Sequence, residues 1–207
     1  MLFDCDGVLI KSMEDHFLGW KAAMTSAGVE LQEEDYYPLE GTPVSAIAKL
    51  YCQRFNINPD EFDKIAKLKE EHYFQHHKLQ FYPGVQEIIL ELHGKGVKLA
   101  MVTGGELDRI KRTLPAPFLT CFDVIITGEM VERGKPHPDP YLQAARALGL
   151  HPEECLVVEN APLGVQSAKS AGMYCIAVTN TVDRERLSKA DEIVSDVNKI
   201  TWSAMFK

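Results

Sequence analysis

The feature that most constrains the fold is a regular alternation of short apolar runs and helical stretches after Gly84. The apolar runs cover residues 98–102, 124–126, 156–158 and 174–178. The intervening residues 85–93, 106–114, 139–148 and 163–171 have helical spacing. Because the runs are almost continuously apolar, each strand is expected to be buried on both faces. The pattern predicts an α/β fold, with a Rossmann-like parallel sheet core flanked by helices.

The residues between the first apolar run and this alternating region have a different pattern, which is helical throughout. Phe17, Trp20 and Met24 form an apolar stripe with helical spacing, and Ser12 with Asp15 resembles a capping box at its start. Two further helices are expected to begin at Thr42-Pro43 and at Asn58-Pro59.

This change of pattern predicts two domains. We expect residues 1–12 and 81–207 to form the α/β catalytic core domain, and residues 13–80 to form a small all-helical cap domain. Ligands bind such sheets beyond the carboxyl ends of the strands. An insert after the first strand would therefore cover the ligand site and could move as a lid.

Composition limits the classes of partner. The formal net charge of −8 argues against a nucleic-acid partner, because phosphate backbones are bound by clustered Lys and Arg. No apolar run approaches the roughly 18 residues of a membrane span, and the N-terminus lacks a secretory signal pattern, so we expect a cytoplasmic protein. The five widely spaced cysteines indicate buried free thiols in a reducing compartment. The sequence carries no signal for an oligomeric state.

Two carboxylates stand at the end of the first apolar run. Asp4 and Asp6 are two positions apart, so they can point the same way from an extended segment, and Gly7 permits a sharp bend. Carboxylate oxygens of this kind suit a magnesium ion that also binds a phosphate. Taken alone, the same residues fit a surface turn equally well.

Three later segments also place polar residues at expected strand ends or before helices. Thr103-Gly104-Gly105 brings a hydroxyl group and flexible backbone amides to a helix start, which suits an anion, although an N-cap threonine in a tight turn has the same sequence. Lys135 lies in a proline-rich loop, where a lysine is ordinarily solvated. Glu159-Asn160 ends a buried strand.

Together, and in this order, the four segments resemble the four motifs of the haloacid dehalogenase-like superfamily. The resemblance implies that Asp4 is the nucleophile, Asp6 the general acid/base, Thr103 a ligand of the transferred phosphoryl group and Lys135 a neutralising cation. Gly104 and Gly105 would contribute to substrate binding beside Thr103.

The resemblance also implies a magnesium ion, held by Asp4, Asp6, Glu159 and Asn160. Most relatives carry two acids at the last motif, whereas this chain has Glu159 followed by Asn160. The loss of one negative charge should weaken magnesium binding unless Glu159 compensates.

The activity implied is that of a magnesium-dependent phosphatase acting on a small phosphorylated metabolite through an aspartyl-phosphate. Asp4 would attack phosphorus in line. Asp6 would protonate the leaving oxygen and then activate water, a task that a raised pKa would help.

Within the superfamily the chain resembles the β-phosphoglucomutase-like subgroup, through its first motif and through His16-Phe17-x-x-Trp20. The resemblance assigns His16 to gating proton transfer at the substrate. The mutase's Leu-Lys-Gly-x-x-Arg segment here reads Leu39-Glu40-Gly41-Thr42-Pro43-Val44, which lacks both positive charges. This difference favours a phosphatase over a sugar-phosphate mutase, although Lys67 and Lys69 could partly substitute.

Two other readings are weaker. A dehalogenase is disfavoured because that branch lacks the second aspartate, and Asp6 is suited to expelling an alcohol from a phosphate ester. A non-catalytic binding protein on the same fold is supported in the sequence by Asn160 alone.

Overall fold

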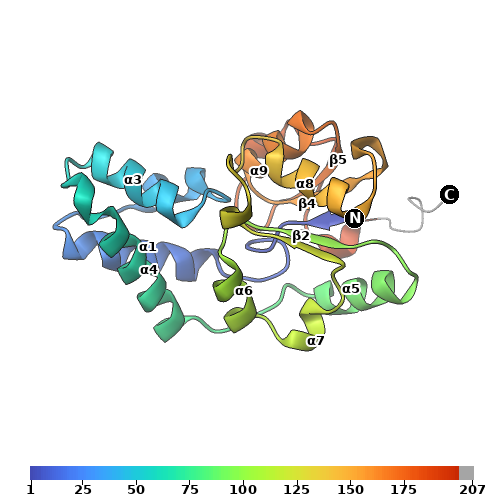
Figure 1. The fold of residues 1–207 in the computed structure, drawn as a ribbon, viewed down its shortest axis with the longest axis horizontal. Coiled ribbons are helices and arrows are strands. Elements are labelled where there is room, and N and C mark those ends of the chain that lie inside the picture. Colours follow the sequence, from blue (N-terminus) through green and yellow to red (C-terminus); the bar gives the residue numbers. More distant parts are fainter. Residues whose placement is uncertain (201–207) are drawn as a thin grey trace.

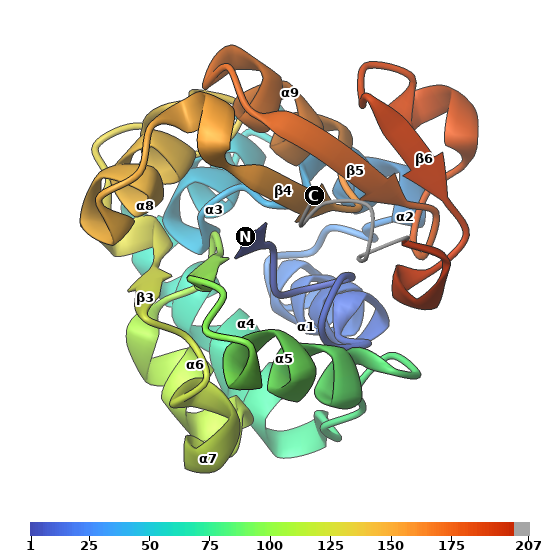
Figure 2. The same ribbon diagram turned by 90° about the vertical axis from the view of Figure 1, so that its right-hand side faces the viewer.

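The computed structural model describes residues 1–200, and its sheet has six parallel strands in the order β3-β2-β1-β4-β5-β6 (Figure 2). This arrangement confirms the predicted α/β fold and places the short first strand in the middle of the sheet. The strands are β1 (Leu2–Phe3), β2 (Ala100–Val102), β3 (Val124–Ile126), β4 (Leu156–Glu159), β5 (Tyr174–Val178) and β6 (Glu192–Val194).

Helices cover both faces of the sheet, which explains why its strands are apolar throughout. Phe3 points to one face and Leu2 to the other, and both side chains are fully buried. The helices on the Phe3 face are α5 (Val85–Gly94), α6 (Leu107–Thr113) and α7 (Ala116–Leu119). Those on the Leu2 face are α8 (Asp139–Leu148) and α9 (Pro162–Ser170).

The helical cap follows β1 directly and has a core of its own (Figure 1). Its helices are α1 (Met13–Ser26), α2 (Glu33–Tyr36), α3 (Val44–Arg54) and α4 (Phe62–His76). Trp20 of α1 meets Tyr51 of α3 edge to face, with ring centroids 5.3 Å apart. The predicted apolar stripe on α1 is therefore the buried face of this helix.

Two segments of chain connect the cap to the core, and they run side by side. The Lys11 amide donates to the Gln80 carbonyl at 2.8 Å, and Ile10 pairs with Phe81 in an antiparallel bridge. The division of the chain after residues 12 and 80 stays a prediction. Because only these paired segments join the two parts in sequence, movement of the cap requires few backbone changes.

The capping box expected at the start of α1 is wrong. Ser12 makes no side-chain cap to the helix, and its hydroxyl instead donates to Asp6 Oδ1 at 2.6 Å. The Ser12 backbone has φ −117° and ψ −7°, close to helical values, whereas a capping serine needs an extended conformation.

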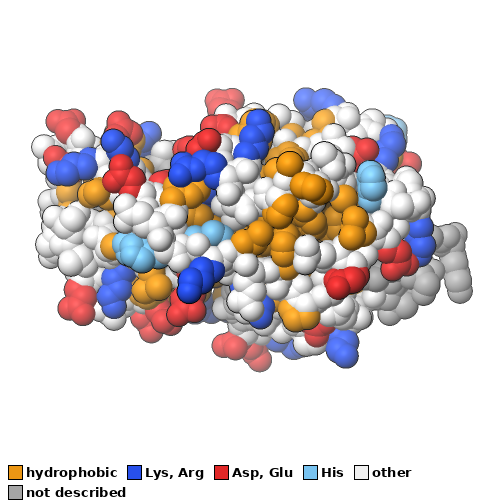
Figure 3. All heavy atoms as spheres, turned by 90° about the horizontal axis from the view of Figure 1, so that it is seen from below, with side chains coloured by type: hydrophobic (Ala, Val, Ile, Leu, Met, Phe, Trp, Pro, Cys, Tyr) orange, Lys and Arg blue, Asp and Glu red, His pale blue; other side chains and the backbone are white. Residues whose placement is uncertain are grey.

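The face of the molecule that bears α5, α6 and α7 in Figure 1 has apolar side chains gathered near its middle, with charges of both signs around them (Figure 3). Leu90 of α5 is 58% exposed. No helix within residues 1–200 combines the length and the apolar character needed to cross a membrane. All five cysteines are buried and free, as the sequence predicted.

Candidate active site

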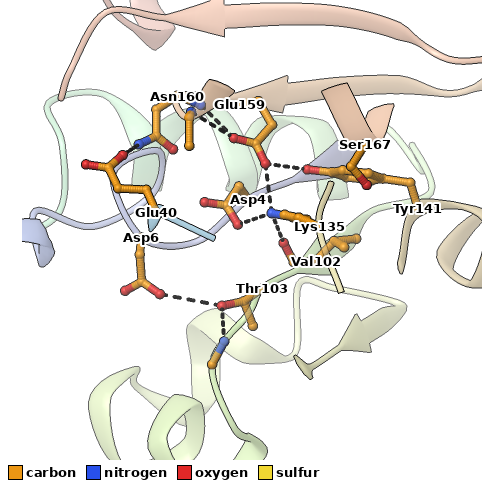
Figure 4. Close-up of polar contacts among 12 residues, drawn as sticks. Asp4, Asp6, Glu40, Val102, Thr103, Lys135, Tyr141, Glu159, Asn160 and Ser167 are labelled. Carbon is orange, nitrogen blue, oxygen red and sulfur yellow. Dashed lines mark hydrogen bonds and ion pairs between the residues drawn. The ribbon is translucent and has the colours of Figure 1, made fainter. Parts of the chain in front are cut away.

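Three of the sequence-predicted residues meet because they follow neighbouring parallel strands. Asp4 follows β1, Thr103 follows β2 and Glu159 ends β4. Phe3 is in register with Met101 on one side and with Val158 on the other, so Asp4 lies level with the ends of both neighbouring strands. Figure 4 shows the three side chains around one point at this edge of the sheet.

Lys135 reaches the same point from the loop that precedes α8. Its Nζ donates to Asp4 Oδ1 at 2.6 Å, to Glu159 Oε1 at 2.7 Å and to the Val102 carbonyl at 3.1 Å. Burial by itself lowers the pKa of Lys135, but the Asp4 and Glu159 carboxylates outweigh it and raise that pKa. The predicted neutralising cation is therefore in place beside the predicted nucleophile.

Asp4 is buried among other acids. Burial raises its pKa to about 7, against the opposing effect of Lys135, and the Glu159 and Asp6 carboxylates raise it further. The carboxylates of Asp4 and Glu159 thus share the one ammonium group of Lys135.

The Glu159 carboxylate is fully used within the protein. Its Oε1 accepts hydrogen bonds from Lys135 and from the Tyr141 hydroxyl at 2.7 Å, and its Oε2 accepts from the backbone amides of Asn160 and Ala161. Glu159 therefore holds Lys135 in position and has no carboxylate oxygen without a partner.

Asp6 lies in a second buried ion pair, which the sequence did not reveal. Arg109 of α6 binds both of its oxygens, with Nη1 3.0 Å from Oδ1 and Nη2 2.5 Å from Oδ2. Ser12 and His16 also contact Oδ1. Burial alone would raise the pKa of Asp6, but Arg109 and then His16 hold it well below its usual value. The raised pKa expected for this acid/base is therefore wrong for the conformation seen here, because of Arg109.

His16 connects the cap to this ion pair and is neutral. Lys69 Nζ approaches His16 Nδ1 at 2.9 Å, and since an ammonium can only donate, Nδ1 must accept. His16 Nε2 then carries the proton and donates to Asp6 Oδ1 at 3.1 Å, so its 3.3 Å approach to Arg109 Nη1 is a contact between two donors. Burial, followed by the charge of Lys69, lowers the pKa of His16 to about 4.

The Thr103-Gly104-Gly105 segment forms a tight turn against Arg109. Thr103 Oγ1 accepts from the Gly105 amide at 3.0 Å and donates weakly to Asp6 Oδ2 at 3.5 Å. A Cβ at position 105 would lie 1.9 Å from Arg109 Nη2, so glycine is needed for the guanidinium to reach Asp6. At Gly104 a Cβ would lie 2.5 Å from the carbonyl oxygen of Gly41, where the cap meets the core.

Sequence reasoning also missed Glu40, which enters the site from the cap. Its side chain is buried, and Oε2 accepts from Asn160 Nδ2 at 3.1 Å and from the Thr181 hydroxyl at 2.9 Å. Burial raises the pKa of Glu40 to about 8, opposed by the Thr181 hydrogen bond. In the sequence Glu40 signified only a missing positive charge, because nothing there shows where a loop side chain points.

The two lysines considered as substitutes for the missing positive charges behave differently. Lys69 lies in the wall of the site but is bonded to His16 and to Glu70 Oε1. Lys67 is exposed and pairs with Glu71 at 3.7 Å.

The cavity enclosed by cap and core is small. It measures about 40 Å³, and its wall includes Asp4, Asp6, His16, Gly104 and Arg109. Pockets that bind small molecules usually measure about 300 to 1,000 Å³, so this cavity is too small for a metabolite. A larger groove of about 1060 Å³ lies at the outer boundary of cap and core, but Asp4 does not line it. We therefore expect the cap to move when a substrate reaches Asp4.

The oxygens available for a magnesium ion differ in part from the expected set of Asp4, Asp6, Glu159 and Asn160. Within residues 1–200 no group of three or more His, Cys, Asp or Glu side chains is arranged to hold a metal ion. However, the buried side-chain oxygens of residues 1–200 that have no hydrogen-bond partner include two beside Asp4 and Glu159, namely Asn160 Oδ1 and Glu40 Oε1. Amide and carboxylate oxygens are ligands that Mg²⁺ accepts, so Asp4 and Asn160 fit this ion, whereas Asp6 and Glu159 have other partners.

Comparison with known proteins identifies relatives over nearly the whole chain. Residues 1–178 match the family described as haloacid dehalogenase-like hydrolase. Hexitol phosphatase A of Escherichia coli is 33% identical over 208 residues, covering 97% of this chain and 92% of that protein. Protein SUPPRESSOR OF QUENCHING 1, chloroplastic, of Arabidopsis thaliana is 34% identical over 200 residues, which are 92% of this chain but 19% of that longer protein.

Solved structures show the same architecture. A putative β-phosphoglucomutase from Bacteroides vulgatus is 33% identical, with a TM-score of 0.83, covering 94% of this chain and 82% of that one. CbbY from Rhodobacter sphaeroides, solved in complex with phosphate, is 26% identical, with a TM-score of 0.86, covering 100% of this chain and 98% of that one.

Proposed function

Since the chain belongs to the haloacid dehalogenase-like hydrolase family, in the β-phosphoglucomutase-like subfamily with a helical cap after the first strand, we propose that it is a magnesium-dependent phosphatase of a small phosphorylated metabolite, of the sugar-phosphate class. The observation that supports this most strongly is the convergence of Asp4, Thr103 and Lys135 at one point. E. coli hexitol phosphatase A, by its name, acts on a hexitol phosphate, which supports the substrate class.

In the first half of the reaction, a carboxylate oxygen of Asp4 attacks phosphorus and the bond from phosphorus to the ester oxygen breaks. Asp6 gives its proton to the departing oxygen, so an alcohol and an aspartyl-phosphate form. Lys135 offsets the negative charge of the phosphoryl oxygens beside Asp4. Thr103 and the Gly104 amide are the candidate hydrogen-bond donors to those oxygens, and the Gly105 amide, which donates to Thr103 Oγ1, positions that hydroxyl group.

In the second half, Asp6 accepts a proton from water, and the water oxygen bonds to phosphorus as the bond to Asp4 breaks. Inorganic phosphate leaves, and Asp6 is protonated again for the next turnover. A magnesium ion held by Asp4 and Asn160 would supply further positive charge at the phosphoryl group.

The contact between Asp6 and Arg109 must loosen during this cycle. While both oxygens of Asp6 accept from Arg109, the carboxyl group is ionised and cannot donate a proton. An incoming phosphate is a strong competitor for a guanidinium group, so substrate binding provides a way to release Asp6.

A phosphatase fits the cap better than a mutase. A mutase needs positive charge for the second phosphate of a bisphosphate, but Val44 supplies none and Lys69 is bonded to His16 and Glu70. Neither Val44 nor Lys69 therefore offers a free positive charge to a second phosphate.

The test is phosphate release from a panel of hexose, hexitol and pentose phosphates with MgCl₂, together with the generic substrate p-nitrophenyl phosphate. Asp4→Asn should reduce the rate by about 10³-fold or more, because a nucleophile is lost. Asp108→Asn, which changes an exposed residue of α6, is the matched control. An Asp4→Asn protein that keeps the wild-type rate refutes the nucleophile, and conversion of one sugar phosphate into another identifies a mutase.

A further inference from the structure

Glu40 is an acidic cap residue buried at the core's catalytic edge. It lies in the loop between the cap's helices α2 and α3, yet its side chain is only 2% exposed. Both of its hydrogen-bond partners, Asn160 and Thr181, belong to the core. Figure 4 shows Glu40 on the same side of Lys135 as Asp4 and Asn160.

The contact between Glu40 and Asn160 leaves one oxygen of each without a partner. Asn160 Nδ2 donates to Glu40 Oε2 of the cap and to the Thr181 hydroxyl of the core, and Figure 4 shows the amide oxygen on the side of Asp4. Asn160 Oδ1 and Glu40 Oε1 are both buried and both lack a hydrogen-bond partner. Buried polar atoms of this kind are costly unless something binds them.

The nearby positive charge is already taken. The Lys135 ammonium group is hydrogen-bonded to the carboxylates of both Asp4 and Glu159. A divalent cation is one group that would satisfy both unpartnered oxygens at once, because it accepts electron pairs from amide and carboxylate oxygens alike.

We propose that Glu40 is a cap-borne ligand of the divalent cation that Asp4 and Asn160 hold. This inference deepens the proposed function and rests on its cation site. Asn160 brings a neutral amide to a position where a second acid is usual, and Glu40 returns a carboxylate to the same site from the cap. The cation then has two protein carboxylates and one amide oxygen, within the range that Mg²⁺ accepts.

The proposal has a structural consequence that a core-only cation site lacks. Because Glu40 belongs to the cap and Asp4 to the core, the bound cation joins the two parts and favours the closed cap. Loading with the cation should therefore protect the loop that carries Glu40, residues 39–43, from exchange with solvent.

A tether without a metal role is the competing explanation, and Glu40→Gln separates the two. Glutamine keeps an oxygen that accepts from Asn160 and Thr181, but it removes the charge that a cation needs. If Glu40 is only a tether, this variant should bind the cation as the wild type does.

The experiment measures Mn²⁺ binding, as a paramagnetic substitute for Mg²⁺, from the signal of free Mn²⁺ at constant pH. We expect Glu40→Gln to raise the Kd for Mn²⁺ at least about tenfold, and the exposed control Glu34→Gln to change it less than about twofold. Adding Asn160→Asp to Glu40→Gln should restore Kd to within about threefold of wild type, because it returns the missing charge. A wild-type Kd for Glu40→Gln overturns the proposal.

A second measurement needs no variant. Hydrogen exchange of the wild-type chain with and without MgCl₂ should show protection of residues 39–43, and equal exchange in both conditions overturns the proposal. Phosphate release by the wild-type chain is measured separately. If the wild-type chain hydrolyses phosphate esters but Glu40→Gln binds Mn²⁺ with the wild-type Kd, only the cation-ligand role of Glu40 is refuted. If the wild-type chain releases no phosphate but Glu40→Gln binds Mn²⁺ more weakly, only the proposed phosphatase reaction is refuted.

Discussion

Replacing Arg109 with methionine should be among the most damaging single changes in the core. The guanidinium makes two hydrogen bonds to Asp6, at 3.0 and 2.5 Å, and the Arg109 side chain is only 4% exposed. Arg109→Met would leave the Asp6 carboxylate with Ser12, neutral His16 and the weak contact from Thr103, none of which carries a positive charge. Removing one member of a buried ion pair costs about 3 to 5 kcal/mol, and the bidentate geometry places this pair at the upper end.

The reasoning is tested by a double-mutant cycle with Asp6→Asn, using urea unfolding followed by circular dichroism at pH 7. In the Asp6→Asn background, Arg109→Met leaves no carboxylate charge without a partner. Its effect on the free energy of unfolding should therefore be about 2 kcal/mol smaller than in the wild type. Arg112→Met is the control, because its ion pair with Asp108 is exposed and should be worth about 1 kcal/mol or less.

The pH dependence of the coupling follows from the sign of the Asp6 shift. Its pKa is well below 3.8 in the folded chain, so the stabilisation is present above about pH 3.8 and is lost only as the pH falls through the lower, folded value. The coupling energy should therefore be constant between pH 5 and pH 8. An equal cost of Arg109→Met in both backgrounds would refute the claim that it acts through the charge of Asp6.

Two further predictions concern the neighbouring groups. His16→Gln should reduce the loss of stability on acidification. In the wild type the pKa of His16 is about 4 in the folded chain and about 6.5 in the unfolded chain, so the unfolded chain binds a proton between these values. The free energy of unfolding of the wild type should therefore fall by about 2 kcal/mol from pH 7 to pH 5 through this group. Urea unfolding at both pH values measures this, and equal losses in both proteins would contradict it. Lys135→Met should lower kcat by about 10²-fold or more in the phosphate-release assay, because no ammonium would then face the phosphoryl group. The exposed change Lys95→Met is its control, and an unchanged kcat for Lys135→Met would rule out the proposed role.

The parts of the site that the sequence predicted are those that sheet geometry brings together. Asp4, Thr103 and Glu159 end neighbouring strands, and the carboxyl ends of parallel strands meet at one edge whatever the details of side-chain packing. Helix α8 was predicted with its observed bounds because Pro140 lies in its first turn and Gly149, with φ +68°, ends it. The sheet edge follows from the general geometry of parallel strands, and the bounds of α8 follow from residues within or next to that helix.

Arg109 and Glu40 could not be found in this way. Asp6 and Arg109 are 103 positions apart, and Glu40 and Asn160 are 120 apart, so no local pattern links the members of either pair. Helical spacing does not show whether an arginine side chain binds a buried carboxylate on another segment or faces solvent. Helices α2 and α7 were missed because each has four residues, too few to show a period.

The contacts of Asp6 link its protonation to the position of the cap. Arg109 approaches Asp6 from the core, whereas His16 approaches from α1 of the cap, and Glu40 joins the cap to Asn160 on the opposite side of the site. The cavity of about 40 Å³ is far smaller than an ordinary ligand pocket, so the proposed mechanism requires the cap to open and withdraw His16 before a phosphate enters and competes for Arg109. In the proposed mechanism, His16 returns to Asp6 when the cap closes over the substrate, at a time when phosphate engages Arg109. The closing movement that excludes water would then also be the event that lets Asp6 take up and transfer a proton.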